Sequence, residues 1–241
     1  MKQEKQERQT GLNRICEKHN KEVSYAAELN DFVCPECREQ RFLDKKILAA
    51  FEKLQLPPRL KECSFENYNP GNDDAKNILK QSIDYASSIA ILKNGMIMVG
   101  GVGTGKTHLA VAICKKVCNY GYEARITTVP EIIRAIRKTW NGGDIDRWGN
   151  KITEEDVIKE YSSVFMLVID EIGSQYGSDS ERIIISEIVN NRYNNMFPTI
   201  LIGNVTLSEA EKYLGQRVID RVKDNGKILV FDWDSYRKPM K

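Results

Sequence analysis

Residues 96–110 read MIMVGGVGTGKTHLA, so a short apolar run leads directly into a glycine-rich loop and then into a helical pattern. The spacing G-x-x-x-x-G-K-S/T is satisfied by Gly100, Gly105, Lys106 and Thr107. Glycines let such a loop fold tightly, which points successive backbone N–H groups at phosphate oxygens, and the following helix adds its positive N-terminal dipole. The stretch therefore predicts a strand–loop–helix unit that binds the phosphates of a nucleotide.

We expect the whole loop to contact the nucleotide. The expected binding residues are Gly100, Gly101, Val102, Gly103, Thr104, Gly105, Lys106, Thr107 and His108. Lys106 is expected to reach the β- and γ-phosphates, and the Thr107 hydroxyl to bind Mg²⁺. His108, just inside the helix, is expected to pack or to lie at the surface rather than to act as a catalyst.

Short β-branched segments alternate with helical patterns on both sides of this loop. Strands are predicted at 96–99, 124–129, 164–169, 199–203 and 227–231, and helices near 73–92, 105–119, 130–140, 179–196 and 208–223. Capping-box spacing predicts helix starts at Thr153 with Asp156 and at Ser208 with Glu211. This alternation predicts an α/β fold with a parallel five-stranded sheet and flanking helices.

Two of the predicted strands end in polar residues. The buried run at 164–169 ends in Asp170 and Glu171, and the run at 199–203 ends in Asn204. Ordinary turns would account for such residues, but open α/β sheets bind ligands at the carboxyl ends of their strands. Beside a phosphate loop, Asp170 is expected to hold Mg²⁺, Glu171 to polarise the attacking water, and Asn204 to orient that water against the γ-phosphate. Glu171 favours an Mg²⁺-dependent ATPase over a kinase.

Arg217 and Arg221 lie four residues apart and therefore project from one face of a predicted helix. Their simplest role is a surface pair bridged to Asp220 or Asp224. An arginine directed at a neighbouring subunit's γ-phosphate would instead stabilise the charge of the transition state.

The N-terminal part of the chain carries a metal-ligand pattern, C-x-x-H, fourteen residues and then C-x-x-C. The predicted ligands are Cys16, His19, Cys34 and Cys37. Two such pairs suit tetrahedral Zn²⁺ with all positions filled, which makes the site structural. The alternative is a set of scattered buried cysteines, and that small-core role is what we expect for Cys63, Cys114 and Cys118.

Three regions follow from these patterns. Residues 1–13 are polar and are expected to form a mobile tail. Residues 14–58 are expected to form the zinc module and a connecting helix, whose apolar periodicity over 38–55 stops at Pro57-Pro58. Residues 59–241 are expected to form the ATPase domain.

A basic helix face is the candidate site for nucleic acid. In VPEIIRAIRKTW, residues 129–140, the apolar Ile132, Ile133, Ile136 and Trp140 cluster on one side of a helical wheel. The opposite side carries Arg134, Arg137 and Lys138, and Arg147 follows nearby. These cations could be a solvated surface or could track the phosphates of single-stranded DNA. Trp148 and Trp140 are candidates for base stacking, although the wheel places Trp140 in the core.

Overall composition indicates a globular chain and says little about partners. Hydrophobic residues make up 41% and charged residues 29%, which argues against disorder. The net charge is only +2, so nucleic-acid contact requires a local basic patch. No run approaches the roughly 20 apolar residues of a membrane-spanning helix, and the first residues lack the apolar stretch of a signal peptide. A cytoplasmic location without membrane contact is expected.

Taken together, residues 60–241 resemble the DnaC-type helicase-loader ATPases of the AAA+ class. The resemblance is carried by CSFENY at 63–68, GTGKTHLA at 103–110, LVIDEIG at 167–173, RVIDR at 217–221 and WDSYR at 233–237. It implies ATP-dependent loading of a hexameric, DnaB-like replicative helicase onto single-stranded DNA, with self-association through the ATPase domain. It also implies that Arg221 is the finger and that the zinc module, which is nearly charge-balanced, docks to the helicase.

Two points limit what the resemblance implies. Only about ten residues follow the last predicted strand, so the usual helical lid and its sensing arginine are missing, which leaves Arg237 as an alternative. IstB-like transposition helper ATPases, which act on duplex DNA, share the same motifs. A third alternative is an adaptor that uses nucleotide only as a structural ligand.

Overall fold

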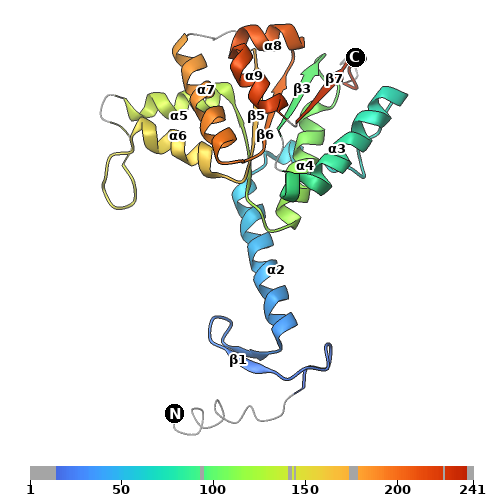
Figure 1. Cartoon of the computed structure of the whole chain (residues 1–241), viewed down its shortest axis with the longest axis vertical. Coiled ribbons are helices and arrows are strands. Elements are labelled where there is room, and N and C mark those ends of the chain that lie inside the picture. Colours follow the sequence, from blue (N-terminus) through green and yellow to red (C-terminus); the bar gives the residue numbers. More distant parts are fainter. Residues whose placement is uncertain are drawn as a thin grey trace.

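The protein's structure, a computed structural model, describes residues 15–92, 95–140, 143, 145–173, 179–224 and 226–237. The tail expected at 1–13 lies outside the described residues. Figure 1 shows a small β-hairpin, a helix that rises from it, and an α/β body at the far end of that helix. No helix in the described ranges has the length and the apolar character needed to cross a membrane.

The body is built on a parallel sheet of five strands in the order β4-β5-β6-β3-β7. The strands are β3 (Met96–Gly100), β4 (Ala124–Thr128), β5 (Met166–Ile172), β6 (Thr199–Gly203) and β7 (Lys227–Phe231). The central strands β3 and β6 are buried along almost their whole length, which is why they are continuous apolar runs rather than alternating ones. The predicted five-stranded parallel sheet is confirmed.

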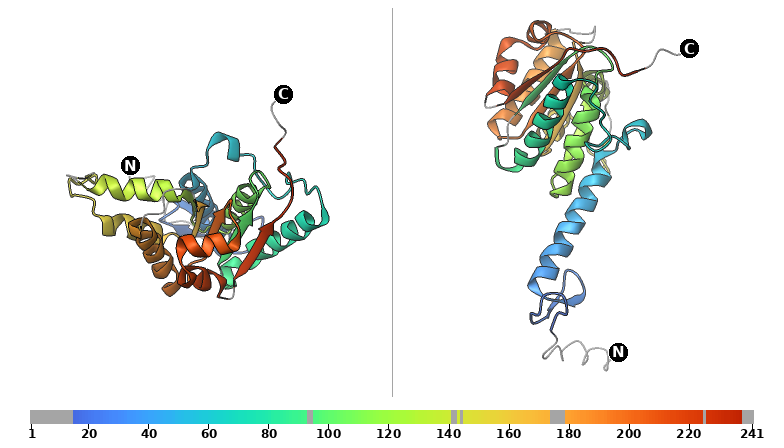
Figure 2. Two further views of the ribbon diagram at one scale, coloured as in Figure 1. Left: turned by 90° about the horizontal axis from the view of Figure 1, so that it is seen from above. Right: turned by 90° about the vertical axis from the view of Figure 1, so that its right-hand side faces the viewer.

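Helices cover both faces of this sheet (Figure 2). They are α3 (Asp73–Leu92), α4 (Lys106–Asn119), α5 (Val129–Thr139), α6 (Glu154–Ser163), α7 (Asp179–Asn194), α8 (Leu207–Leu214) and α9 (Gln216–Lys223). Alternate side chains of β3 enter two separate cores. Met96 and Met98 pack with α3 and α4, whereas Ile97 and Val99 pack with the layer formed by α5 to α9.

Two local predictions are corrected by the structure, and a third is confirmed. The region predicted as one helix over 208–223 is two helices, because Gly215 has φ 82° and interrupts the pattern. The capping box there is Thr206 with Glu209, not Ser208 with Glu211. Helix α6 was marked only by its predicted capping box, Thr153 with Asp156, which is present.

The N-terminal module is a two-stranded hairpin followed by one long helix. Strand β1 (Ser24–Ala26) pairs antiparallel with β2 (Asp31–Val33), and α2 (Pro35–Leu54) follows directly. Only Ala50 and Leu54 of α2 are buried, because its C-terminal end packs against α4 and β4 while the rest projects from the body (Figure 1). A short 3-10 turn, η1 (Pro58–Leu60), leads into the body.

A fully buried arginine connects the end of α6 with the amino ends of β5 and β6. Arg192, on α7, is 0% exposed and donates hydrogen bonds to the carbonyls of Tyr161 (3.0 Å) and Val164 (2.7 Å) at the end of α6. It also donates to the carbonyls of Phe165 (3.1 Å) and Pro198 (2.7 Å) at the starts of β5 and β6. The last carbonyls of a helix lack partners within the helix, so this guanidinium satisfies them and complements the helix dipole.

Replacing Arg192 with Lys should destabilise the fold. A lysine can donate only three hydrogen bonds, so several buried carbonyls would lose their partner, at a cost of about 3 kcal/mol or more. The free energy of unfolding from urea titrations measures this. Arg134→Lys, on the exposed side of α5, is the matched control and should change it by less than about 0.5 kcal/mol. Equal stability of the two variants would contradict the structural role of Arg192.

Candidate nucleotide and metal sites

A cleft of about 720 Å³ lies at the carboxyl ends of the central strands. It is lined by loop residues 102–108, by Asp170 and Glu171 at the end of β5, and by Asn204 after β6. These residues come from three separate strands, and the parallel order of the sheet brings them to one edge. Gly100 and Gly101, also predicted to bind nucleotide, do not line the cleft.

The glycine loop has the backbone that phosphate binding requires. Gly103 and Gly105 have φ values of 76° and 98°, in the left-handed region. A Cβ atom at Gly105 would lie 2.6 Å from the Tyr68 ring, so a side chain there would also collide. Gly105 is the N-cap of α4, and no side chain among the described residues caps its first N–H groups. These donors are therefore available to an anion in the cleft.

Lys106 is folded back into the loop. Its Nζ donates to the carbonyls of Gly100 (3.0 Å) and Gly101 and to the hydroxyl of Thr104 (3.3 Å). The side chain is only 4% exposed, and burial lowers the pKa of Lys106 to about 8. A phosphate group in the cleft would favour the charged ammonium, so the lysine is suited to bind anion on this loop.

The two predicted magnesium ligands are in direct contact. The Thr107 hydroxyl donates to Oδ2 of Asp170 at 2.8 Å, and Oδ1 of Asp170 accepts from the backbone N–H of Glu171 at 2.7 Å. Hydroxyl and carboxylate oxygens are the ligands that Mg²⁺ prefers. The donor set therefore fits the ion, and Thr107 and Asp170 could hold it together with phosphate oxygens.

The backbone at Glu171 is strained, and its conformation places the Glu171 side chain at the cleft. Glu171 has φ 61°, and the pairing of β5 with β6 shifts its register between Ile169 and Ile172. A left-handed non-glycine residue costs on the order of 1–3 kcal/mol and persists only where the surroundings enforce it. Here the irregularity turns the exposed Glu171 side chain into the cleft, which Asn204 also lines.

Of the residues that form the outer walls of the cleft, sequence patterns pointed only to Arg237, as an alternative sensing arginine. One wall is formed by Arg59, Leu60, Asn67, Tyr68 and Asn69, and another by Tyr236 and Arg237. Asn67, Tyr68 and Tyr236 lie in the segments CSFENY and WDSYR, which carried the resemblance without giving these residues a role, and the other three, Arg59, Leu60 and Asn69, lie outside both segments.

The C-terminal segment returns over the loop. The backbone N–H of Tyr236 donates to the Gly103 carbonyl at 3.0 Å, and its hydroxyl accepts from the N–H of Gly71 at 3.1 Å. Tyr68 makes edge-to-face contacts with both Tyr236 and His108. His108 is thus a packed residue, as expected, although it also lines the cleft.

The candidate arginines lie in two different places. Arg237 lines the cleft, and its charge contributes to the lowered pKa of Lys106. Arg217 and Arg221, on α9, face a separate open hollow of about 780 Å³ and do not line the nucleotide cleft of their own chain. Arg217 is exposed, whereas Arg221 is half-buried.

The predicted basic face of α5 is formed, but the predicted core position of Trp140 is wrong. Ile132, Ile133 and Ile136 are buried, and Arg134, Arg137 and Lys138 are exposed. Arg137 is not a free cation, since it donates to the buried Glu181 at 3.1 Å. Trp140 is 48% exposed rather than core, because it follows the last turn of the helix and its Nε1 donates to Glu154 at 3.3 Å.

Beyond α5, a tight loop exposes a second tryptophan. Trp148 is 71% exposed, and the Arg147 guanidinium stacks 4.0 Å from its ring centroid. The Asp146 carboxylate accepts the backbone N–H groups of Trp148 and Asn150, both at 2.9 Å, which fixes the loop. These donors hold the pKa of Asp146 below its usual value.

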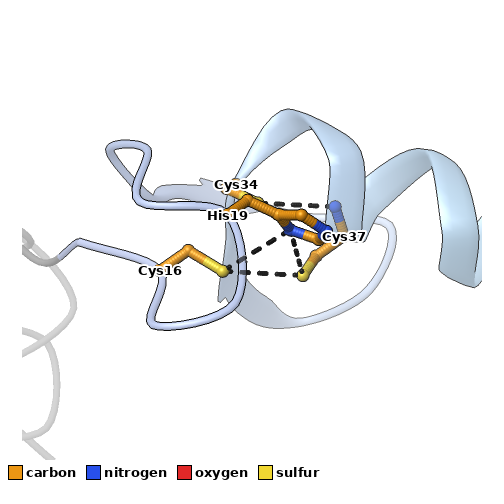
Figure 3. A group of neighbouring side chains, drawn as sticks. All are labelled: Cys16, His19, Cys34 and Cys37. Atoms are coloured by element: carbon orange, nitrogen blue, oxygen red, sulfur yellow. Dashed lines mark hydrogen bonds between the residues drawn. The ribbon is translucent and has the colours of Figure 1, made fainter.

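The four predicted zinc ligands meet at the base of α2, as Figure 3 shows. Their ligand atoms lie within 4.8 Å of one another. Sulfur atoms of Cys16 and Cys37 are 3.8 Å apart, and Nδ1 of His19 lies 3.3 Å from the sulfur of Cys34 and 3.4 Å from that of Cys37. Tetrahedral zinc with bonds of about 2.3 Å to sulfur and about 2.0 Å to nitrogen requires ligand separations of roughly 3.5–3.8 Å. The cluster fits a closed zinc site.

Local structure shifts the pKa values of these thiols in different directions. Cys34 is the N-cap of α2 and accepts the N–H of Cys37 at 3.4 Å, so both sulfurs sit at the positive end of the helix. The backbone N–H of His19 is the main cause that lowers the pKa of Cys16 to about 6. The hydrogen bond with Cys34 raises the pKa of Cys37 to about 11, whereas a bound cation would favour its thiolate.

Comparisons with known proteins agree with this geometry. The family model described as "IstB-like ATP binding protein" matches residues 11–241. The replicative helicase loader DnaC of Escherichia coli is 35% identical over 201 residues, which covers 83% of this chain and 78% of that protein. The DnaC of Buchnera aphidicola subsp. Baizongia pistaciae is 38% identical over 177 residues, 73% of this chain and 70% of that protein. The crystal structure of the DnaC helicase loader superimposes with a TM-score of 0.63 at 26% identity, covering 73% of this chain and 99% of that one.

Purified protein should carry one zinc ion per chain, and Cys34→Ser should release it. Loss of one thiolate opens a four-ligand site, and the hairpin has little core of its own to hold it. Metal analysis together with circular dichroism measures both effects, and the body should stay folded and bind nucleotide. Cys63→Ser, outside the cluster, is the control and should keep full zinc. Full zinc occupancy in Cys34→Ser would show that the ligands are assigned wrongly.

Proposed function

The chain belongs to the family of IstB-like ATP binding proteins, and we propose that it is a cytoplasmic loader that uses ATP to deliver a hexameric, DnaB-like replicative helicase to single-stranded DNA. One observation carries the proposal: the residues proposed to bind the phosphates and magnesium and to activate water line one cleft, in a chain that is similar over 83% of its length to a replicative helicase loader.

ATP hydrolysis is proposed to use the cleft residues in fixed roles. The N–H groups at the start of α4 and the Lys106 ammonium bind the phosphates. Mg²⁺, held by Thr107 and Asp170, would neutralise charge on the phosphate oxygens. Glu171 polarises a water molecule, and the Asn204 amide orients it toward the γ-phosphate.

Self-association completes the site in this proposal. Arg221 does not line the cleft of its own chain, so it can reach a γ-phosphate only in a neighbouring copy. Arg237 lies in the same chain's cleft and can bind phosphate there. Hydrolysis would then require an assembly in which one copy supplies the nucleotide cleft and the next supplies the finger.

The N-terminal module is the proposed helicase-docking part. We divide the chain into the tail at 1–13, the module at 14–58 and the ATPase domain at 59–241. Helix α2 exposes large apolar side chains, with Leu48 62% and Phe42 38% exposed, whereas Leu43 lies against the body at Gly121. Exposed apolar groups favour a protein partner over the phosphates of a nucleic acid.

Single-stranded DNA is proposed to lie across α5 and the loop that follows it. Arg134, Lys138 and Arg147 offer positive charge to the phosphates, and Arg137 contributes more weakly because Glu181 neutralises it. Trp148, held open with Arg147 against its ring, offers a face on which a base can stack.

The family description favours one second candidate, a transposition helper ATPase that acts on duplex DNA. The two functions differ in which DNA stimulates hydrolysis. Equal stimulation by duplex and single-stranded DNA would favour the transposition helper.

The decisive experiment is capture of the hexameric replicative helicase from the same cell, with and without ATP, followed by transfer to single-stranded DNA. Lys106→Ala should lose nucleotide binding and loading. Glu171→Gln should retain ATP but lose turnover by about 10²-fold or more, since only the water-activating carboxylate is gone. Glu187→Gln, at an exposed position on α7 outside the cleft, controls for loss of a carboxylate. Failure to capture helicase under either condition would reject the loader, and equal loss of ATP binding in both variants would reject the assigned roles.

Arg221→Ala should keep ATP affinity and reduce hydrolysis by about 10³-fold or more, because it removes a cation that acts in the transition state. Mixed with Lys106→Ala chains, it should recover activity, since one variant keeps the cleft and the other keeps the finger. Steady-state hydrolysis at several mixing ratios measures this. Parental hydrolysis by Arg221→Ala alone would contradict the finger role and make Arg217 the next candidate.

A further inference from the structure

The surroundings of Arg221 differ from those of the other basic residues on α9. Its guanidinium carbon lies 5.4 Å from the ring centroid of Tyr193, near the end of α7. One terminal nitrogen, Nη1, is buried and has no hydrogen-bond partner within the described part of the chain. Both residues line the open hollow of about 780 Å³ beside α9.

Tyr193 is itself held in place. Its hydroxyl donates to Oδ2 of Asp224 at 2.8 Å, and this hydrogen bond, with the nearby carboxylate charge, raises the pKa of Tyr193. Asp224 closes the end of α9, where its N–H bonds to the Asp220 carbonyl. The ring is thus fixed between α7 and the end of α9, the helix that carries Arg221.

An aromatic partner leaves the guanidinium free to bind an anion. Lys223, on the same helix, pairs with Glu211 at 3.0 Å, so its charge is already balanced. Arg221 takes part in none of the ion pairs found among the described residues. A ring face attracts the cation and limits its rotamers without neutralising it, so the positive charge of Arg221 is not balanced by an ion pair and its Nη1 donor is unpaired among the described residues.

We infer that Tyr193 is a positioning residue that presents Arg221 to the γ-phosphate bound by a neighbouring copy of this chain. The inference rests on the proposed function, in which Arg221 acts on a partner's nucleotide. It also gives a physical reason to prefer Arg221 over the exposed Arg217, whose side chain has no such support among the described contacts. Misplacing a catalytic group by about 1 Å can slow a reaction as much as 10²-fold.

The test compares Tyr193→Ala and Tyr193→Phe with Arg221→Ala in steady-state ATP hydrolysis by the full chain. Tyr193→Ala should lower kcat about tenfold or more while the KM for ATP stays within about twofold, because its own cleft is intact. Tyr193→Phe keeps the ring and should retain most of the activity. Tyr120→Ala is a matched control, since Lys116 lies 5.4 Å over the Tyr120 ring far from the hollow, and it should leave kcat unchanged.

Two further measurements separate positioning from general damage. Lys106→Ala chains carry an intact Tyr193 and Arg221, so mixing should restore hydrolysis to Tyr193→Ala. The double variant Tyr193→Ala with Arg221→Ala should be no slower than Arg221→Ala alone, because both changes remove one function. An additive loss, or a loss that mixing does not rescue, would overturn the positioning role.

The inference and the proposed function fail in different ways. Normal kcat in Tyr193→Ala beside a slow Arg221→Ala would overturn the role of Tyr193 and leave the finger in place. Normal kcat in Arg221→Ala would overturn both.

Discussion

The hydrogen bond between the Thr107 hydroxyl and the Asp170 carboxylate joins two segments that are 63 residues apart in the chain. It can form only if β3 and β5 end at the same edge of the sheet, with β6 between them. The strand order therefore decides whether this hydroxyl and this carboxylate can meet. Arg192 supports that order from the opposite edge, where it binds the carbonyls before β5 and β6. The contacts that stabilise the sheet and the residues that line the cleft therefore lie at opposite ends of the same strands.

A direct packing contact links the N-terminal module with the phosphate loop. The buried end of α2 packs on α4, where the Cys118 thiol donates to the Ala50 carbonyl at 3.7 Å. Helix α4 begins at the phosphate loop, and α2 begins at the metal cluster. Two helices in contact therefore span the distance between the metal cluster and the nucleotide cleft. If the module binds a partner as proposed, the packing of α2 on α4 provides a direct structural connection from that partner to the phosphate loop.

Sequence patterns predicted the parts of the molecule that depend on local chemistry. The five strands are apolar runs, and the glycine loop needs special backbone angles, so both are visible in short windows. What could not be predicted depends on contacts between distant segments. The return of Tyr236 over Gly103 and the exposure of Trp140 follow from where other elements end. The break at Gly215 was also missed. The helical pattern of the sequence continues across it, and only the backbone angle of Gly215 separates the two short helices.

The two arginines suggest how hydrolysis is tied to assembly. Arg237 approaches the cleft from its own chain, on a segment that is anchored to the loop by the Tyr236 backbone. Arg221 lines a separate hollow beside α9, where it contacts the Tyr193 ring and makes no ion pair among the described residues. In the proposed function, an isolated chain has the cleft and Arg237 but lacks the second cation. A neighbouring copy would supply that cation, so the rate of hydrolysis would report whether copies are assembled, which is a property that an ATP-driven loader requires.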